Sequence, residues 1–475
     1  MNWLRYNFGD RLAYVVTYML QSTEYNAGDF LRWVISTYRF DTVIKRRKLL
    51  MTSKARLIYG ICFLVQIGLL AIVVSLFISQ DIGLVLVGAT VLVLLPYIVS
   101  ILAIAPLMFG HLIIQLPRQK QIISNAQKIY HNHPAQKIAI VGSYGKTSMK
   151  EFLRTILDEK FHVAASPGNI NTPIGLSNFA NKLDGNEDFL ILEFGESRVG
   201  DIRELSILTN PNDAVITGIS SAHLKTFKTL ENIESTLLEV APFVVDGRLF
   251  ISNENRIDLT KITNNKIVTY DINGIGDWTV KNIRVSLEGT KFELVVDGQT
   301  YECNTKLIGE HFVASLVAAM YMAVLCGMKL ELVVESTKYI KPFEHRMERI
   351  DMSGAIVIDD TYNGNSSGIA AGLNFMKNID AAKKIYVTPG LVEQGNKSQE
   401  IHEQIGRQIA DAGINKVYLI KNSVTNYIIE GLSEMQYSGD ITIVDNPIEF
   451  YENLAMYTGR GDVVLMQNDW TDNYR

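Results

Sequence analysis

A short glycine-rich segment carries the strongest chemical signal in the sequence. The apolar run Lys137 to Val141 leads directly into Gly142-Ser143-Tyr144-Gly145-Lys146-Thr147-Ser148. In such a setting glycines let the backbone approach phosphates, Lys146 neutralises their charge and Thr147 can ligate Mg²⁺. Apolar residues then recur at helical spacing, which predicts a helix that begins at the loop: Met149, Phe152, Leu153, Ile156 and Leu157. We therefore predict a phosphate-binding loop between a strand and a helix.

The loop is shorter than the usual phosphate-binding pattern. That pattern has four residues between its glycines, whereas only two separate Gly142 from Gly145. The alternative interpretation is an ordinary surface Gly-Lys-Thr turn. The strand before the loop and the helix after it favour phosphate binding.

Two further polar residues follow apolar strands. The run Phe189 to Leu192 ends in Glu193, and the run Ala214 to Thr217 is followed by His223. Because parallel strands end at a common edge, both side chains are expected near the loop. A carboxylate and a neutral imidazole there would hold Mg²⁺ together with Thr147. Either residue alone is more often an ordinary strand-end or core side chain, but their shared edge favours a magnesium site.

The elements that position these residues alternate between short apolar strands and amphipathic helices from Lys137 onward, which predicts a doubly wound α/β sheet. A chain of 475 residues with 47% hydrophobic residues requires more than one core. Its net charge of -5 gives no general attraction to nucleic acid. The three cysteines have neither metal-type nor disulfide-framework spacing, which fits a reducing compartment: Cys62, Cys303 and Cys326.

A membrane hairpin is predicted before this region. Leu57 to Gln80 contains no charged residue, and a second uncharged stretch runs from Ile82 to Pro117, interrupted by Pro96 and Pro106. Each stretch is long enough to span a bilayer, the second with a kink and an interfacial tail. The alternative, two buried helices of a soluble core, is disfavoured by their length without charge.

The charges beside the hairpin predict its orientation. Basic residues flank both ends and none lies in the connecting turn, so both ends are expected in the cytoplasm: Lys45, Arg46, Arg47, Lys48, Lys54, Arg56, Arg118 and Lys120. The chain would then be a multi-pass protein of the cytoplasmic membrane with its catalytic domains in the cytoplasm. A cleaved signal peptide is not expected, because the apolar run begins more than fifty residues in.

The expected organisation has five parts. Residues 1–52 form a cytoplasmic or interfacial helical segment, 53–117 the two-span hairpin and 118–136 a linker. Residues 137–340 form a central domain that contains the glycine loop, and 341–475 a C-terminal domain. For the first forty residues two arrangements remain open: helices lying at the membrane interface, or helices packing on the spans.

From Lys137 to the C-terminus the chain resembles the Mur ligase family, and within it the branch that adds D-alanyl-D-alanine. The short glycine loop is one of several matching motifs in matching order. The others are Ser166-Pro167-Gly168-Asn169-Ile170-Asn171-Thr172-Pro173-Ile174-Gly175, Glu193-Phe194-Gly195, Ser221-Ala222-His223-Leu224, His345-Arg346-Met347-Glu348, Asp359-Asp360-Thr361-Tyr362-Asn363-Gly364-Asn365, and Pro389-Gly390-Leu391-Val392-Glu393-Gln394-Gly395 with His402 and Gly406. The resemblance implies a P-loop-type central ATPase domain and a smaller Rossmann-like C-terminal α/β domain.

The resemblance also implies a reaction. ATP phosphorylates a substrate carboxylate, an amine attacks the acyl phosphate, and an amide, ADP and phosphate are released. The implied substrates are ATP, D-alanyl-D-alanine or a related amine, and a UDP- or lipid-linked muramoyl peptide; Mg²⁺ is the implied metal, and a monomer is expected.

Residue roles follow from the same resemblance. The loop from Gly142 to Ser148 would bind the nucleotide, with Lys146 on the β and γ phosphates. Arg346 and Asp360, and with them Asn363, would reach it from the C-terminal domain, so that domain closure assembles the site. Two overlapping sets complete the implied roles: catalysis by Lys146, Glu193 and His223, and magnesium binding by Thr147, Glu193 and His223.

Two departures from the family keep alternatives open. Many members carry a carbamylated lysine fourteen residues after the magnesium histidine, where this chain has Leu237, so either Glu234 or Glu239 substitutes or catalysis is weakened. A membrane hairpin also stands where the family has its uridine-nucleotide-binding domain. The alternatives are a folylpolyglutamate or poly-γ-glutamate type of ligase, and an ATP-binding membrane scaffold with weakened turnover.

Overall fold

The structure is a computed structural model that describes residues 2–9, 11–23, 25–40, 49–110, 113, 115–168, 170–219, 227–255, 257–262, 266–362, 364–391 and 394–468. The chain divides into two compact units, Met1–Gln121 and Ile122–Arg475. Each unit is described by itself below.

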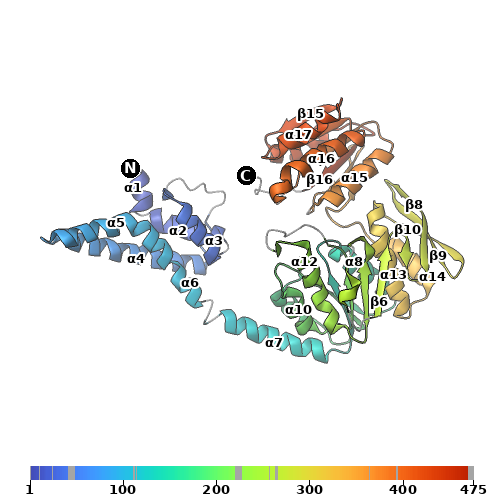
Figure 1. Ribbon diagram of the computed structural model, residues 1–475, viewed down its shortest axis with the longest axis horizontal. Coiled ribbons are helices and arrows are strands. Elements are labelled where there is room, and N and C mark those ends of the chain that lie inside the picture. The colour runs from blue at the N-terminus through green and yellow to red at the C-terminus, as the bar shows by residue number, and fades with distance from the viewer. Residues whose placement is uncertain are drawn as a thin grey trace. The chain divides into compact units, whose positions relative to one another are not determined.

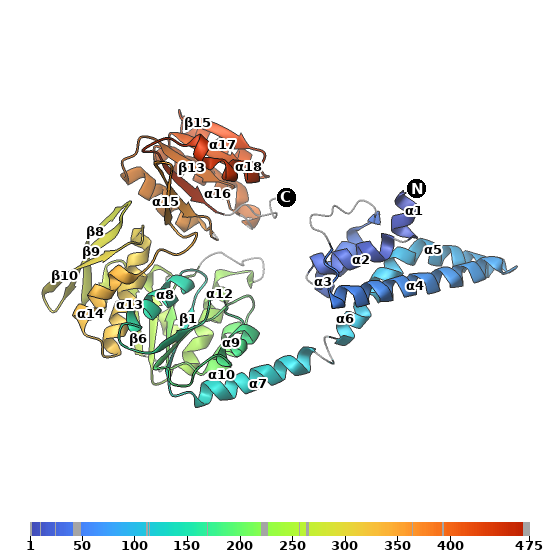
Figure 2. The ribbon, with the colours of Figure 1, turned by 180° about the vertical axis from the view of Figure 1, so that it is seen from behind.

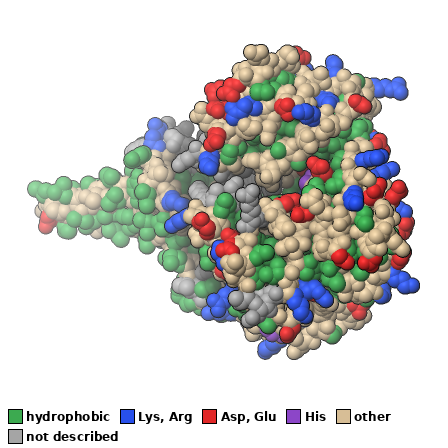
Figure 3. All heavy atoms as spheres, turned by 45° about the vertical axis from the view of Figure 1, so that its right-hand side comes forward, with side chains coloured by type: hydrophobic (Ala, Val, Ile, Leu, Met, Phe, Trp, Pro, Cys, Tyr) green, Lys and Arg blue, Asp and Glu red, His purple; other side chains and the backbone are tan. Residues whose placement is uncertain are grey.

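The first unit is built around a helical hairpin. Helix α4 (Ser53–Ile78) and helix α5 (Ile82–Leu102) run side by side, and the short α6 (Ile104–Gly110) follows (Figure 1). The stretches Ser53–Ile78 and Ile82–Gly110, of 26 and 29 residues, are long and apolar enough to cross a membrane. Most side chains on the hairpin surface are hydrophobic, as Figure 3 shows.

The second predicted span contains two successive helices. Helix α5 continues through Pro96 and ends at Leu102, and α6 begins at Ile104. An apolar helix tolerates an internal proline because neighbouring groups satisfy the freed backbone. Within α5 the hydroxyl of Ser100 donates a hydrogen bond of 2.7 Å to the Pro96 carbonyl, one turn before it.

Three N-terminal helices pack on the hairpin: α1 (Asn2–Asn7), α2 (Arg11–Ser22) and α3 (Ala27–Ser36). Leu12, Val16 and Phe30 share one hydrophobic core with Cys62 of α4 and Val99 of α5. The amide nitrogen of Gln66, a polar residue inside α4, donates to the carbonyls of Phe8 and Gly9 at 3.0 and 2.8 Å. Of the two arrangements left open by the sequence, the structure therefore has the one in which these helices pack on α4 and α5.

The second unit begins within helix α7 (Leu116–Asn132), which occupies most of the segment expected as a linker. Ala126 and Tyr130 of α7 are fully buried, and the Tyr130 hydroxyl donates to the Leu176 carbonyl at 2.8 Å. The C-terminal half of α7 is thereby part of the central domain's core.

The central domain contains a ten-stranded sheet in the order β10-β9-β8-β7-β6-β5-β4-β1-β3-β2 (Figures 1 and 2). Six strands run parallel: β1 (Gln136–Val141), β2 (Val163–Ala165), β3 (Phe189–Glu193), β4 (Asp213–Ile216), β5 (Arg248–Ser252) and β6 (Lys266–Asp271). Four extend it as an antiparallel wing: β7 (Gly274–Ile275), β8 (Trp278–Ser286), β9 (Gly289–Val296) and β10 (Gln299–Thr305).

Helices cover both faces of this sheet. Ile138 and Ile140 of β1 face a core shared with α8 (Lys146–Leu157) and α13 (Val313–Leu325). The alternate residues Ala139 and Val141 face the opposite core, which contains side chains of α9 (Pro173–Ala180), α10 (Asp201–Thr209) and α12 (Leu230–Leu237). Helix α14 (Leu330–Ser336) packs on α13. The predicted doubly wound domain is confirmed, and the five apolar residues predicted for one face of α8 are all fully buried.

The C-terminal domain is a second, smaller α/β layer with sheet order β11-β12-β16-β13-β14-β15. Its strands are β11 (Glu348–Met352), which is antiparallel, and β12 (Ala355–Asp360), β13 (Lys384–Thr388), β14 (Lys416–Ile420), β15 (Asp440–Val444) and β16 (Val463–Gln467). Its helices are α15 (Ser366–Asn378), α16 (Ser398–Asp411), α17 (Thr425–Glu434) and α18 (Pro447–Glu452).

Two glycines let α16 and α17 touch along their backbones. A β-carbon at Gly406 would lie 2.2 Å from the Ile428 carbonyl oxygen, so alanine there would force the helices apart. We expect Gly406→Ala to lower the free energy of unfolding by about 1–3 kcal/mol, measured by urea unfolding of residues 122–475. Gly368→Ala is the control, because its added methyl would have no atom nearer than 3.6 Å. Equal stability of the two variants would contradict this expectation.

Candidate active site

The glycine loop joins β1 to α8 in a conformation that only glycine adopts easily. Gly142 and Gly145 have φ angles of +147° and +76°, and Gly145 is the N-cap of α8. A β-carbon on Gly142 would lie 2.3 Å from the Thr217 hydroxyl, because the end of β4 presses against the loop. The Ser143 amide donates to the Gly218 carbonyl at 2.6 Å. The loop is therefore held close to β4, with the N-terminus of α8 beginning at its end.

Two buried ion pairs lie beside the loop. The Lys146 ammonium contacts a Glu196 carboxylate oxygen at 2.9 Å and also donates to the Gly142 carbonyl. The Lys150 ammonium, whose side chain is fully buried, contacts a Glu193 carboxylate oxygen at 3.1 Å. The Thr147 hydroxyl donates to that same Glu193 oxygen at 3.1 Å. The structure thus brings Lys146, Thr147 and Glu193 together, as the sequence predicted.

A second layer of groups fixes Glu193. The Asn171 amide nitrogen donates to its other carboxylate oxygen at 3.3 Å, and the Glu193 backbone amide donates to the Ser166 hydroxyl at 3.1 Å. Lys150 also donates to the Gly168 carbonyl, so one ammonium ties α8 to the loop after β2. The Glu193 carboxylate is 2% exposed and held from three directions.

Sequence reasoning missed Lys150 and Glu196. Lys150 stands four residues after Lys146, and Glu196 stands three residues after Glu193. A lysine within the buried first turns of a helix and a second glutamate beside a strand end were the available signals. Neither is specific, because such charges usually face solvent.

Two predicted site residues, His223 and Asn363, lie outside the described residues. Among the other loop residues, the Tyr144 ring packs over Gly218, and burial, followed by the nearby Glu254 carboxylate, raises the pKa of Tyr144 to about 12. Ser148 is buried in the first turn of α8. The buried Ser143 hydroxyl has no hydrogen-bond partner in the described part of the chain.

Helix α12 presents no carboxylate where the family has its carbamylated lysine. Leu237 is fully buried in the hydrophobic core. Glu234 pairs with Lys261 at 3.0 Å, and Glu239, just after the helix, accepts from the backbone amides of Gly200 and Arg203 at the start of α10. Both glutamates considered as substitutes are therefore engaged elsewhere.

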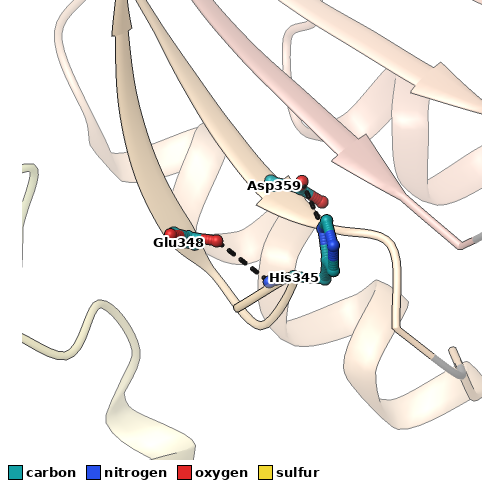
Figure 4. A group of neighbouring side chains, drawn as sticks. All are labelled: His345, Glu348 and Asp359. Atoms are coloured by element: carbon teal, nitrogen blue, oxygen red, sulfur yellow. Dashed lines mark hydrogen bonds and ion pairs between the residues drawn. The ribbon is translucent and has the colours of Figure 1, made fainter. Parts of the chain in front are cut away.

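The C-terminal domain begins with a hydrogen-bonded turn formed by His345, Glu348 and Asp359 (Figure 4). The His345 ring contacts the Asp359 carboxylate at 2.8 Å, and this bond raises the pKa of the imidazole. The His345 backbone amide donates to Glu348 at 3.0 Å. The possible ligand atoms of this cluster lie within 4.8 Å of one another, but the His345 ring is bonded to Asp359 and the Glu348 carboxylate to the His345 backbone amide. We interpret the cluster as a brace for the turn that carries Arg346.

Arg346 lies on this braced turn, and Asp360 is the last residue of the neighbouring strand β12. The Arg346 guanidinium stacks 4.4 Å from the centre of the Tyr362 ring. Asp360 accepts from the Met347 backbone amide at 3.3 Å and from the Gln467 amide at 2.8 Å. Asn365, from the same motif, caps α15 by accepting from the Gly368 amide at 2.9 Å.

Residues of both domains of the second unit line a cleft of about 620 Å³. One wall is the outer face of α8 with Thr147, Glu151 and Arg154. The other is the segment from Tyr339 to Glu344 together with Arg346 and Tyr362. Arg346 therefore faces the same cavity as the loop residue Thr147.

The pKa of Asp360 predicts a pH-dependent stability. Burial raises this pKa from 3.8 to about 6, against the opposing Gln467 hydrogen bond. Because the folded state holds the proton more tightly than the unfolded state, this contribution is fully present below pH 4 and is lost as the pH rises through 6. Between about pH 4.5 and pH 7.5 this group should lower the free energy of unfolding by about 2 kcal/mol, and we expect Asp360→Asn to remove that decrease.

The measurement is urea unfolding of residues 122–475 at pH 4.5 and at pH 7.5, with wild type and variant compared at each pH. The change in their difference between the two pH values is the readout, since any effect of the substitution that does not depend on pH cancels in it. An unchanged difference would contradict the assignment.

The arrangement around the loop fits a nucleotide with Mg²⁺. Thr147 and Glu193 offer the hydroxyl and carboxylate oxygens that this hard cation prefers. Lys146 and the start of α8 offer positive charge, and the unpartnered Ser143 hydroxyl is buried in the loop itself. These residues would hold the cation and the phosphates.

Comparison with known proteins gives the family. Residues 140–323 match the Mur ligase middle domain, and residues 345–467 match the Mur ligase glutamate ligase domain. The UDP-N-acetylmuramoyl-tripeptide--D-alanyl-D-alanine ligase of Rickettsia prowazekii is 31% identical over 308 residues, which cover 63% of this chain and 68% of that protein. The chain spans from 62% to 72% of the length of such relatives, for example those of Borreliella burgdorferi and Bacillus subtilis.

Solved structures agree in fold. MurF from Acinetobacter baumannii superimposes with a TM-score of 0.66 at 21% identity, covering 74% of this chain and 77% of that one. MurF from Thermotoga maritima, solved in complex with ADP, gives 0.65 at 24% identity, covering 74% and 80%. The matched regions contain the glycine loop from Gly142, Glu193, Arg346 and Asp360, and the chain belongs to the Mur ligase family of ATP-dependent amide ligases.

Proposed function

We propose that this chain is a membrane-associated ligase of peptidoglycan-precursor synthesis that joins D-alanyl-D-alanine, or a related amine, to the carboxylate of a muramoyl peptide. The names of the relatives support the substrate class. The observation that carries the proposal is the cluster of Lys146, Thr147 and Glu193 at the loop, with Arg346 on the opposite wall of the same cleft.

The geometry supports phosphoryl transfer by positioning and charge neutralisation. The loop amides and Lys146 bind the β and γ phosphates, while Thr147 and Glu193 hold Mg²⁺, with His223 as a further ligand. A cation held by these residues would supply the positive charge that stabilises the transferred phosphoryl group. Lys150 is not free to bind phosphate, because it pairs with Glu193 and fixes that carboxylate in place.

The C-terminal domain completes the nucleotide site. Arg346 adds positive charge against the phosphates from across the cleft, and Asp360 and Asn363 contact the nucleotide beside it. Because Arg346 and the loop belong to different domains, small movements about the turn at His345 control when both groups reach the phosphates. The carboxylate substrate accepts the γ phosphoryl group, and the amine then displaces phosphate from the acyl phosphate to form the amide.

The hairpin anchors the enzyme to the cytoplasmic membrane. Its two helices have the length and the apolar surface that insertion requires, and the basic residues near both ends favour a cytoplasmic location for both. The active site is then in the cytoplasm, where ATP is available. The anchor brings the ligase to a precursor that is lipid-linked or made at the membrane.

The test is phosphate release by the detergent-purified full chain with ATP, Mg²⁺, D-alanyl-D-alanine and UDP-linked muramoyl tripeptide, each omitted in turn. Release that requires both carbon substrates is the expected result. Nucleotide binding without release would direct the search to a lipid-linked acceptor. No response to any acceptor and amine would favour a scaffold over a ligase.

The role of the first unit is tested separately. A variant that begins at Ile122 retains the whole second unit. If the anchor serves a lipid-linked acceptor, this variant loses turnover of that acceptor in vesicles more than turnover of a soluble one. Equal loss with both acceptors would contradict a role in substrate delivery.

A further inference from the structure

The N-terminal helices cover only part of the helical hairpin. At one end of α2 the Gln21 side chain exchanges two hydrogen bonds of 2.9 Å with the backbone of Leu50, just before α4. Near the other end of α2, the Gln66 amide nitrogen donates to two backbone carbonyls in the turn between α1 and α2. Helix α2 therefore lies beside the first half of α4 and runs in the opposite direction.

The free end of the hairpin extends beyond α1, α2 and α3, as Figures 1 and 2 show. We call residues 67–94 the hairpin tip, and residues 53–66 and 95–102 the hairpin base. Leu95 of the base is fully buried in the core that it shares with the N-terminal helices. In the tip, by contrast, most of the large apolar side chains are exposed. The tip is thus the part of the first unit that presents an apolar surface on all sides.

The hairpin tip is too short to cross a membrane by itself. It contains residues 67–78 of α4 and residues 82–94 of α5. At 1.5 Å per residue, these two arms are about 18–20 Å long. The hydrocarbon layer of a bilayer is about 30 Å thick. A crossing would therefore require the hairpin base to enter the hydrocarbon layer as well.

Charged side chains near Gln66 oppose such a crossing. Gln66 follows Arg56, the last charged residue of α4, by ten residues, so it lies about 15 Å farther along the helix. In a crossing hairpin with Arg56 at the membrane surface, Gln66 would lie at the centre of the bilayer. Arg5 and Arg11 flank the turn that bonds to Gln66, and both are exposed. Because an exposed arginine at that depth is strongly unfavourable, the base belongs outside the hydrocarbon layer.

The hairpin base has the surface expected of a structure in the headgroup layer. Leu57 and Leu64, on the face of α4 opposite Gln66, are exposed. The N-terminal helices on the other side expose charged residues such as Arg11 and Arg32. An assembly with one apolar and one polar side lies between the headgroups and the acyl chains.

The charge of this part of the chain favours an anionic leaflet. Residues 1–56 contain ten lysines and arginines against four aspartates and glutamates, a net charge of +6, although the whole chain has a net charge of -5. Such a local excess of positive charge attracts anionic headgroups, which are concentrated on the cytoplasmic side of membranes. The partner of this surface is therefore the cytoplasmic leaflet.

The turn at the end of the hairpin tip bonds its own polar groups. The Ser79 hydroxyl accepts from the Asp81 amide at 3.2 Å. An Asp81 carboxylate oxygen accepts from the Gly83 and Leu84 amides at 2.7 and 3.4 Å, at the N-terminus of α5. Inside hydrocarbon, polar groups must be satisfied within the protein. These bonds supply part of the internal bonding that an end buried in the bilayer requires.

We propose that the first unit enters the membrane without crossing it: the hairpin tip ends inside the hydrocarbon layer, and the hairpin base and α1–α3 lie in the headgroup layer of the cytoplasmic leaflet. This inference rests on the membrane association in the proposed function. It replaces the two crossings that the lengths of the apolar stretches predicted. Both ends of the hairpin then lie on the cytoplasmic side, and the turn at Gln80 does not reach the outer surface.

The test is the reaction of Gln80→Cys with a charged, membrane-impermeant maleimide, in full-length protein in bacterial membranes. Labelling is measured in right-side-out vesicles, in inside-out vesicles and after denaturation in SDS. In both kinds of vesicle we expect less than about a tenth of the labelling seen in SDS, because hydrocarbon excludes the charged reagent. The wild-type chain gives the background from its three native cysteines.

Two controls show that the reagent reports each side. Ser36→Cys, on the exposed surface at the end of α3, should react in inside-out vesicles and not in right-side-out vesicles. The second control is Gln80→Cys with seven apolar residues inserted into each arm of the hairpin tip. The insertions add about 10 Å and almost two helical turns, so the helix faces stay in register and the hairpin becomes long enough to cross. This variant should react in right-side-out vesicles.

A nitroxide attached to Gln80→Cys gives a second measurement. In reconstituted vesicles, dissolved oxygen should relax this label more strongly than a water-soluble nickel complex does, since oxygen concentrates in hydrocarbon. A label on Ser36→Cys should show the reverse order.

Two results would overturn the inference, and they differ in what they mean for the proposed function. Labelling of Gln80→Cys in right-side-out vesicles would show that the hairpin crosses the membrane, and the proposed membrane association would stand. Labelling in inside-out vesicles at the level of Ser36→Cys would place the hairpin tip in water, and the proposed membrane association would fail as well. Neither result bears on the ligase reaction, which phosphate release tests separately.

Discussion

Replacing Glu193 with alanine is expected to abolish measurable turnover and to destabilise the central domain at the same time. The carboxylate is proposed to hold Mg²⁺ with Thr147, and losing it should lower kcat by about a thousandfold or more. It is also the partner of the fully buried Lys150. Because the variant leaves that ammonium buried without its counter-ion, we expect a loss of about 3–5 kcal/mol in the free energy of unfolding.

A second variant distinguishes the loss of turnover from the loss of stability. Adding Lys150→Met to Glu193→Ala removes the unpaired ammonium, so unfolding in urea should recover much of the lost stability. Phosphate release should not recover, because the magnesium ligand is still missing. A double variant as unstable as Glu193→Ala would show that the Lys150 pair has little part in stability. Turnover near the wild-type rate in Glu193→Ala would show that Glu193 is not a magnesium ligand.

The loop and the strand end beside it were predictable because their signals are local. An apolar run that passes into glycines, followed by helical spacing, specifies a strand, a turn and a helix without any distant contact. Glu193 was predictable for the same reason, since the apolar run of β3 ends at that residue. Parallel pairing of β1 with both β3 and β4 then brings their carboxyl ends to one edge.

Lys150 and Glu196 were not predictable, because their roles depend on contacts between distant segments. The buried position of Lys150 depends on Gly168, which lies in the loop after β2, and on Glu193 at the end of β3. No pattern around residue 150 specifies either contact. Glu196 likewise resembles a solvated loop glutamate until Asn171 and Asp201 are seen to hold its neighbours.

The first unit shows where apolar patterns become ambiguous. A helix with aromatic and aliphatic residues on one face suits a membrane interface as well as another helix. The hydrogen bonds from Gln66 to the Phe8 and Gly9 carbonyls show the N-terminal segment packed on another helix. They join residues 58 and 57 positions apart, so no local pattern could predict them. The second span raised a different ambiguity, since proline disrupts helices in water yet is tolerated at Pro96 of α5.

Arg346→Ala is expected to lower kcat by about a hundredfold to a thousandfold while changing the affinity for ATP much less. The loop and Lys146 bind the phosphates from the central domain, whereas Arg346 approaches from the far wall of the cleft. Its charge therefore matters most when the domains close and negative charge develops on the transferred group. Steady-state phosphate release and calorimetry with a non-hydrolysable ATP analogue measure the two quantities.

The control for this prediction is Arg407→Ala, which removes the same charge from an arginine that pairs with Glu434 on the outer helices of the C-terminal domain. It should leave both kcat and nucleotide affinity unchanged. Arg346 stacks on Tyr362, so Arg346→Lys tests whether charge alone is sufficient. A lysine cannot reproduce the planar stacking of the guanidinium, and we expect it to restore only part of kcat. Equal losses of kcat and of ATP affinity in Arg346→Ala would instead make Arg346 a ground-state nucleotide contact, already engaged before the domains close.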